Sequence, residues 1–320
     1  MSAPRTRIGS SDLEVYPLSL GGNVFGWTSD DDQSFAVLDA YADAGGNFID
    51  TADGYSHWVP GNHGGESERA IGRWLARRTD RDSFVIATKV STHPDFKGLA
   101  PSNIKAAADA SLGRLQVDHL DLYYAHFDDP AIPLADTVGA LSELVDAGKV
   151  RAIAISNYTP ERIDEWFEVT ELDGLHRAVA LQPHYNLVER DFENGLRERA
   201  ERFGLGVVPY FALASGFLTG KYRDGVDVDS ARAAGAVKYL NDRGRRVLAT
   251  LDEVAAGHGV SVASVALAWL REQPTVVAPI ASARTVEQLP ALLESVTLRL
   301  GADEVAALTD ASSAEDDAAA

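Results

Sequence analysis

The chain has 320 residues, 45% of them hydrophobic and 24% charged, which is typical of a globular protein and excludes a disordered one. It contains 29 Lys and Arg against 48 Asp and Glu, and its formal net charge of −19 argues against nucleic acid and anionic membranes as partners. The absence of Cys excludes disulfides, thiolate metal sites and cysteine nucleophiles.

The chain begins with a predicted β-hairpin over residues 6–15 (TRIGSSDLEV). After the hairpin, short runs rich in Val, Ile, Leu and aromatic residues alternate with segments of amphipathic helical period. The expected strands are 17–22, 47–51, 84–90, 120–126, 150–157, 178–182, 206–211 and 275–280. The expected helices are 33–44, 66–78, 101–115, 134–147, 160–169, 191–203, 243–258, 261–271 and 286–293. Gly45, Gly148 and Gly204 follow expected helix ends, where a left-handed cap favours Gly.

Eight continuously apolar strands that alternate with helices indicate a parallel sheet covered on both faces. An open, doubly wound sheet would satisfy this pattern, but eight uninterrupted units favour an α/β fold of the (β/α)8 TIM barrel type, in one domain over residues 1–320.

Residues 213–243 form a long loop after the seventh strand, and such loops are usually functional or disordered. We expect residues 312–320 to be a disordered tail. The N-terminus lacks the apolar core of a signal peptide, so we expect a cytoplasmic protein without a membrane span.

The polar side chains follow the strand ends. In a TIM barrel, active-site residues lie at the C-terminal ends of the strands. The residues at or just after those ends are Asp50, Tyr55, Lys89, His126, Ser156, Asn157, Gln182, Tyr210 and Arg284. We therefore expect these side chains to meet at one end of the barrel.

Four of these residues suggest a chemistry. Lys89 lies inside an apolar run, and a buried ammonium needs a carboxylate, for which Asp50 is the nearest candidate by strand order. A Tyr beside that cation, such as Tyr55, would have a lowered pKa. A neutral His126 could hold or polarise a carbonyl oxygen. The set suits proton donation to a developing alkoxide, and it contains neither a nucleophile nor a metal site.

The sequence resembles the aldo-keto reductase family over essentially its whole length. The segments that carry the resemblance are NFIDTADGY (47–55), GESERAIGRWL (65–75), IATK (86–89), DHLDLYYAHFDD (118–129), GKVRAIAISN (148–157), QPHYNL (182–187), GFLTGKY (216–222) and ARTVEQL (283–289). Their order and their placement on the expected strands make the match specific.

The resemblance implies an NADP(H)-dependent reduction of an aldehyde or ketone. It implies that Tyr55 is the general acid, that Lys89 lowers the pKa of Tyr55, that Asp50 pairs with Lys89, and that His126 orients the carbonyl. The residues it assigns to the cofactor are Gly22, Asn23, Asp50, Ser156, Asn157, Gln182, Tyr210, Phe211, Ala212, Leu213, Gly216, Leu218, Lys221, Ala281, Ser282, Arg284 and Gln288.

Arg284 would contact the 2′-phosphate, which favours NADPH over NADH. The family often has Asn where this chain has Leu292, so the preference between the two cofactors stays open. Trp27 and Trp58 follow the first two strands and are either walls of the substrate pocket or ordinary packing residues. The partner is a small-molecule carbonyl compound, and the substrate and the oligomeric state are open.

Two other functions and a metal site are alternatives for this sequence. One is a redox-sensing, nicotinamide-binding subunit of a larger assembly with slow turnover, and the start of this chain almost directly at the hairpin argues against it. Another is a hydrolase on the same barrel, for which Asp128 and Asp129 would be a carboxylate pair, although adjacent residues rarely face one substrate. The spacing of the His residues that could suggest zinc matches no compact ligand motif, so we expect no metal. These residues are His57, His63 and His93.

Overall fold

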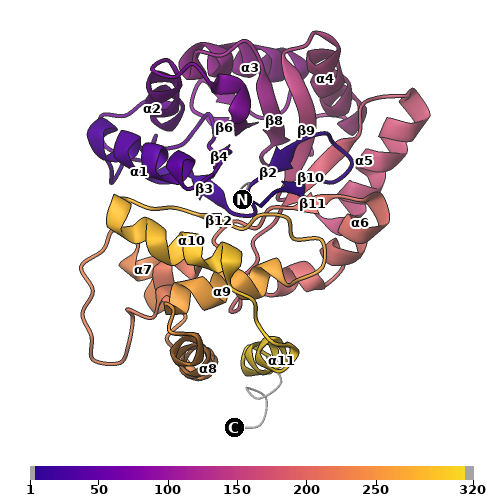
Figure 1. The fold of residues 1–320 in the computed structure, drawn as a ribbon. Coiled ribbons are helices and arrows are strands. Elements are labelled where there is room, and N and C mark those ends of the chain that lie inside the picture. The colour runs from indigo at the N-terminus through magenta and orange to yellow at the C-terminus, as the bar shows by residue number, and fades with distance from the viewer. Residues whose placement is uncertain (1–3, 314–320) are drawn as a thin grey trace.

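The computed structural model describes residues 4–313 and contains one sheet of eight parallel strands surrounded by helices (Figure 1). The strand order is β11-β10-β9-β8-β5-β4-β3-β12. The strands are β3 (Ser19–Gly21), β4 (Phe48–Asp50), β5 (Val85–Val90), β8 (Leu120–Ala125), β9 (Val150–Ser156), β10 (Ala178–Gln182), β11 (Gly206–Val207) and β12 (Ile280–Ala281). Each expected strand contains one of them, apart from the last, where β12 ends one residue later than expected.

The two ends of the sheet meet through backbone hydrogen bonds. Val207 N donates to Thr275 O at 2.8 Å, Val277 N donates to Val207 O at 2.9 Å, and Ile280 N donates to Pro209 O at 2.9 Å. These bonds join β11 to the segment that leads into β12. The sheet is therefore closed, which confirms the (β/α)8 barrel and rules out the open, doubly wound alternative.

The helices follow the strands in the expected alternation. The long ones are α1 (Asp31–Asp43), α2 (Glu66–Leu75), α3 (Pro101–Leu115), α4 (Leu134–Asp146), α5 (Pro160–Asp173), α6 (Leu196–Phe203), α8 (Asp242–His258), α9 (Val262–Arg271) and α10 (Leu289–Thr297). Two helices were not predicted, the short α7 (Ala233–Val237) inside the long loop and α11 (Ala302–Ala311), which lies beside α8 (Figure 1). Gly45, Gly148 and Gly204 have positive φ values of 89°, 71° and 67°, as their positions after helices predict.

Several boundaries differ from the prediction for identifiable reasons. The expected helix 191–203 is interrupted at Gly195, whose φ is 94°, so that only α6 is α-helical. The expected strand 206–211 is reduced to β11, because Pro209 has no N–H to donate to a neighbouring strand. In the expected strand 275–280, Val276 forms an isolated bridge with Val207 before β12 begins. An additional hairpin, β6 (Thr92–His93) with β7 (Phe96–Lys97), follows β5.

Alternation along the strands separates two apolar layers. Phe48, Val85, Leu122 and others fill the barrel interior, and their sequence neighbours pack outward against the helices. On β5 the same alternation points Lys89 into the barrel and Thr88 toward α2, where Thr88 Oγ1 donates to Glu68. The two-residue alternation of side chains along the strand thus determines which polar side chains point into the site.

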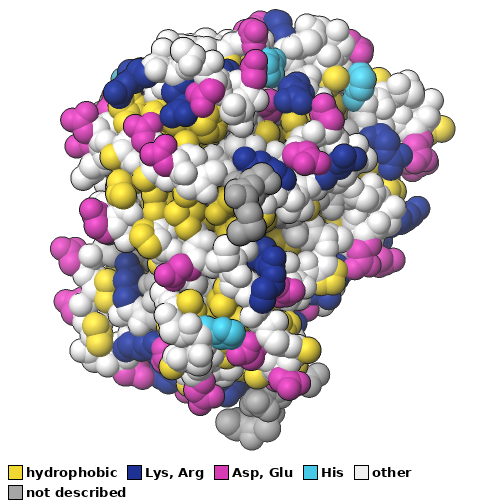
Figure 2. Space-filling view, viewed as in Figure 1, with side chains coloured by type: hydrophobic (Ala, Val, Ile, Leu, Met, Phe, Trp, Pro, Cys, Tyr) yellow, Lys and Arg dark blue, Asp and Glu magenta, His cyan; other side chains and the backbone are white. Residues whose placement is uncertain are grey.

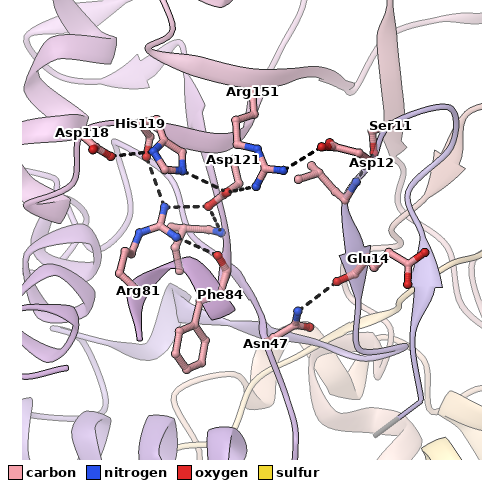
Figure 3. A network of polar contacts seen from close by, with 12 residues as sticks. Ser11, Asp12, Glu14, Asn47, Arg81, Phe84, Asp118, His119, Asp121 and Arg151 are labelled. Carbon is pink, nitrogen blue, oxygen red and sulfur yellow. Dashed lines mark hydrogen bonds and ion pairs between the residues drawn. The ribbon is translucent and has the colours of Figure 1, made fainter. Parts of the chain in front are cut away.

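The N-terminal end of the barrel is closed by the predicted hairpin, β1 (Thr6–Arg7) and β2 (Glu14–Val15). Its apolar residues belong to the interior cluster. Figure 3 shows the polar network that ties it to the barrel, in which Asp121 accepts from Arg81 at 2.7 Å and from Arg151 at 2.9 Å. Arg151 also donates to Asp12 of the hairpin at 3.2 Å. Figure 2 shows the face of the molecule that carries this end, with acidic and basic side chains interspersed.

Within residues 4–313, no single helix is long and apolar enough to cross a membrane; only the pair α8 and α9, bent by 97°, passes a test of length and composition together. Of the expected tail, Ser312 is 1% exposed and accepts a hydrogen bond from Arg190 at 2.8 Å. Residues 314–320 lie outside the described part of the chain.

Candidate active site

The four residues expected to be catalytic lie together at the C-terminal ends of β4, β5 and β8. Lys89 Nζ donates to Asp50 Oδ2 at 2.7 Å and to Thr51 O at 2.7 Å, and it lies 3.1 Å from Tyr55 OH. Lys89 and Asp50 are at most 1% exposed. The His126 ring lies edge-on to the Tyr55 ring, with centroids 6.2 Å apart. The arrangement places the Tyr55 hydroxyl beside a buried ammonium and the Tyr55 ring beside an imidazole.

Burial dominates the electrostatics of this group. It raises the pKa of the Tyr55 phenol, and the Lys89 ammonium opposes this rise without reversing it, so the net direction is opposite to the lowering that the resemblance implies. Burial alone would lower the pKa of Lys89, but Asp50 and Tyr55 raise it, and Lys89 stays charged. Burial, with Lys89 nearby, holds the pKa of His126 well below its usual range, so the imidazole is neutral.

A second set of polar residues forms a chain of hydrogen bonds beside the first. Gln182 Nε2 donates to Asp50 Oδ1 at 2.8 Å, and Ser156 Oγ donates to Gln182 O at 2.8 Å. Asn157 Nδ2 donates to His126 O at 2.9 Å, while Asn157 Oδ1 accepts from Tyr210 OH at 2.9 Å. Ser156, Asn157 and Gln182, which the resemblance assigned to the cofactor, therefore also hold the positions of Asp50 and of the His126 backbone.

One cavity of about 830 Å³ runs from Tyr55 and His126 to the N-terminus of α10. The residues assigned to the cofactor that line it are Asn23, Asp50, Asn157, Gln182, Tyr210, Phe211, Ala212, Leu213, Gly216, Lys221, Ala281, Ser282, Arg284 and Gln288. Three others lie behind its wall. Ser156 and Leu218 are fully buried, and a Cβ on Gly22 would lie 2.8 Å from Ser67 Oγ, so Gly22 allows α2 to pack close to its backbone.

Three cations line the cavity: Lys221, Arg232 and Arg284. None of them forms an ion pair with a carboxylate of residues 4–313, in a protein whose net charge is −19. Arg232 was not predicted. It comes from the long loop after β11, donates to Asn23 Oδ1 at 3.0 Å, and lies over the Trp27 ring at 5.6 Å. This contact joins the loop after β11 to the segment after β3. The length of the loop was the only feature of the sequence that pointed to a functional role for it.

Aromatic side chains surround the Tyr55 end of the cavity. The Trp27 and Trp58 ring centroids are 5.6 Å apart, and Trp58 lies 6.3 Å from Tyr55. Phe127 and Phe211 are both 46% exposed, although both line the cavity. Trp27 and Trp58 thus line the cavity, and Phe127 was missed because a single aromatic residue after His126 carries no pattern.

The hydrolase alternative has no carboxylate pair at Asp128 and Asp129. Arg162 binds Asp128 with two hydrogen bonds of 2.8 Å. Asp129 accepts from the backbone N of Leu99 at 3.0 Å. Both carboxylates are therefore engaged in holding loops. Among residues 4–313, no group of three or more His, Cys, Asp or Glu side chains could hold a metal ion.

The sequence model of the Aldo/keto reductase family matches residues 17–313. The chain belongs to this family. It is 34% identical to Protein tas of Escherichia coli over 94% of this chain and 95% of that protein. It is 31% identical to norsolorinic acid reductase B of Aspergillus parasiticus, over 94% and 82% of the two chains, and 31% identical to an aryl-alcohol dehydrogenase of Pestalotiopsis microspora, over 92% and 78%. This aldo/keto reductase family member is therefore an oxidoreductase.

Proposed function

We propose that this protein is a cytoplasmic NADP(H)-dependent carbonyl reductase in which Tyr55 donates a proton to the carbonyl oxygen of an aldehyde or ketone. The observation that carries the proposal is the contact of Tyr55 OH with the buried Lys89 Nζ at 3.1 Å, at one end of a large cavity. Family membership supports the reaction class. A redox-sensing role finds no further support in the site.

The cavity fits a nicotinamide dinucleotide phosphate. Its volume of about 830 Å³ is within the range of ligand sites. Lys221, Arg232 and Arg284, which lack carboxylate partners among the described residues, suit the phosphate groups of such a ligand. Asn157 and Gln182 would hold the carboxamide. The cofactor, when bound, supplies the hydride that reduces the carbonyl carbon.

The residues of the chain supply the proton and hold the substrate. Tyr55 is protonated at neutral pH, as an ordinary phenol is, and burial raises its pKa further. The nearby Lys89 stabilises the phenolate that remains after the proton leaves. Asp50 fixes the position of Lys89. A neutral His126 can donate a hydrogen bond to the same carbonyl oxygen. The oxygen gains the Tyr55 proton, and the phenolate is reprotonated from solvent after the alcohol leaves.

The walls of the substrate end favour a carbonyl compound with a flat aromatic ring. Trp58 lies edge-on to Tyr55, Trp27 lies edge-on to Trp58, and Phe127 and Phe211 also line the cavity. One relative has a name that specifies aromatic compounds, the aryl-alcohol dehydrogenase. Aromatic stacking in such a pocket would place the carbonyl group near Tyr55 and His126.

Replacement of Tyr55 by Phe tests the proposal. We expect the rate of benzaldehyde reduction by NADPH to fall by about 10²–10⁴-fold, the usual contribution of a general acid. NADPH binding, followed by quenching of Trp fluorescence, should stay within about twofold because the phenyl ring is retained.

A matched control is Tyr158→Phe, which removes a buried hydroxyl that has no hydrogen-bond partner among the described residues. This variant should keep normal turnover. Normal turnover in Tyr55→Phe would show that another group donates the proton.

A further inference from the structure

A second buried carboxyl group lies next to the turn that carries Tyr55. Asp53 is fully buried, and its backbone N donates to Lys89 O at 3.1 Å. One carboxyl oxygen, Oδ1, accepts a long hydrogen bond of 3.4 Å from Thr92 Oγ1. The other, Oδ2, has no partner among residues 4–313. Asp53 therefore connects the turn before Tyr55 to both β5 and β6 through contacts that leave half of its carboxyl group unsatisfied.

The charged neighbours of Asp53 are already committed to other groups. Arg114 of α3 is bound to Glu68 of α2 at 2.5 Å. On the other side, the Lys89 ammonium is bound to Asp50. Arg114 still favours an ionised Asp53 through its charge, but no cation among residues 4–313 forms an ion pair with the Asp53 carboxyl.

Two further titratable groups face this layer. Tyr123 of β8 is fully buried with an unpartnered hydroxyl, and burial and Asp53 raise its pKa, so it is neutral. His93 of β6 is 4% exposed, and burial lowers its pKa, so it is neutral as well. Neither supplies a positive charge. Neither Tyr123 nor His93 can therefore neutralise an ionised Asp53.

The buried position favours a protonated Asp53. An ionised carboxylate with an unsatisfied oxygen loses its hydration without replacement, which costs more than burying the neutral acid. Burial, followed by the Glu68 carboxylate, raises the pKa of Asp53 to about 7, against the opposing charge of Arg114 and the backbone N–H groups of Gly54 and Ser91. Near neutral pH the folded protein therefore contains both the neutral and the ionised form.

The turn between Asp53 and Tyr55 connects this carboxyl group to the active site. Space around it is tight, since a Cβ on Gly54 would lie 2.5 Å from Thr92 Oγ1. Ser56, just after Tyr55, has a φ of 70°, so the backbone on both sides of Tyr55 is held in a constrained shape. An ionised Asp53 also opposes loss of the Tyr55 proton, because its negative charge disfavours the phenolate.

Resting on the proposed function, we propose that Asp53 is a positioning residue for Tyr55, which supports proton donation while its carboxyl group is neutral and weakens it when ionised. Asp53 does not touch the substrate. It acts through the turn of residues 52–56 and through its charge. The reductase would then carry, outside the catalytic group itself, a carboxyl that makes turnover decline above neutral pH.

The test is the pH profile of Asp53→Asn, since Asn imitates the neutral acid and cannot ionise. With benzaldehyde and NADPH, the wild-type kcat should fall as pH rises through about 7, and this limb should be absent from the variant. At pH 8 the variant should therefore be the faster enzyme. Asp43→Asn, which removes one exposed carboxylate, is the matched control and should keep the wild-type profile.

Stability gives a readout that does not depend on turnover. Because the folded pKa lies near 7 and the ordinary value is 3.8, the folded state retains a proton that the unfolded chain loses. Wild-type stability from this group should therefore fall as pH rises from about 4 to 7 and stay level above. The Tm of Asp53→Asn minus the Tm of the wild type should therefore increase as pH rises across that window. Should the variant not fold, the infrared carbonyl band of the wild type decides the matter, since a buried protonated carboxyl should titrate near pH 7.

A variant that keeps the wild-type limb, or a wild type without a protonated carboxyl at pH 6, would overturn the role of Asp53. This outcome differs from failure of the proposed function. If the proposed function fails, the wild type will not turn over, or Tyr55→Phe will keep its activity, whatever the state of Asp53.

Discussion

At the scale of single residues, the site depends on a charge pair that is fully removed from water. Lys89 and Asp50 are 0% and 1% exposed and share a hydrogen bond of 2.7 Å. Lys89→Met would leave Asp50 ionised and unpaired, and we expect a loss of about 3–5 kcal/mol in the free energy of unfolding. The double variant Asp50→Asn with Lys89→Met should recover most of this loss, because no unpaired charge remains, yet stay inactive. Urea denaturation and steady-state rates measure the two effects separately.

A double variant no more stable than Lys89→Met would contradict this account, since it would mean that packing rather than charge accounts for the loss. A double variant with normal turnover would show that the cation is not needed beside Tyr55.

The clustering of the candidate catalytic residues could be predicted from the sequence because a parallel barrel brings the ends of its strands together. Lys89 lies near the end of one apolar run and His126 directly follows another, so their placement follows from the pattern of the strands. The direction of the Tyr55 pKa could not be found in the same way, because it depends on how burial compares with the field of Lys89. Asp53 was missed for a similar reason: its burial among committed charges is a property of the packed structure.

At the scale of elements, the loop after β11 is the part of the fold that the sequence described least. Its residues lack the periodicity of a strand or helix, so α7 and the contact of Arg232 with Asn23 were not predicted. The lengths of the expected strands 206–211 and 275–280 were overestimated, because apolar composition does not register the missing N–H of Pro209 and Pro279. Helix α11 was not recognised beside the acidic, Ala-rich end of the chain, although Leu308 is fully buried.

The loop gives a prediction at this scale. Arg232→Ala removes a cation from the cavity and the contact that joins the loop to Asn23. We expect the Kd for NADPH to rise by about tenfold or more, the value of one charge-assisted hydrogen bond, and NADPH to dissociate faster. Fluorescence titration and stopped-flow displacement measure the two quantities.

Arg223→Ala is the matched control in the same loop, since Arg223 is paired with Asp252 at 2.7 Å near the surface. It should change the Kd little. Equal effects of the two variants would indicate general loosening of the loop rather than a specific contact of Arg232.

At the scale of the whole molecule, the charge of the surface opposes the charge of the cavity. The chain carries a net charge of −19, while Lys221, Arg232 and Arg284 line the cavity without carboxylate partners among residues 4–313. An anionic cofactor therefore meets repulsion at long range and attraction at short range. Which of the two governs its approach depends on ionic strength, because the Debye length falls from about 30 Å at 0.01 M to about 8 Å at 0.15 M.

This contrast predicts an unusual salt dependence. At about 0.01 M the whole negative surface acts on NADPH, whereas at about 0.15 M only the residues of the cavity do. The association rate constant should therefore rise with ionic strength over this range, the reverse of the decline seen for partners with opposite charges. In Arg284→Ala the rise should persist, because it comes from the surface, while the rate at 0.15 M should be lower than that of the wild type. A rate that falls steadily with salt in the wild type would mean that the cations of the cavity outweigh the net charge even at long range.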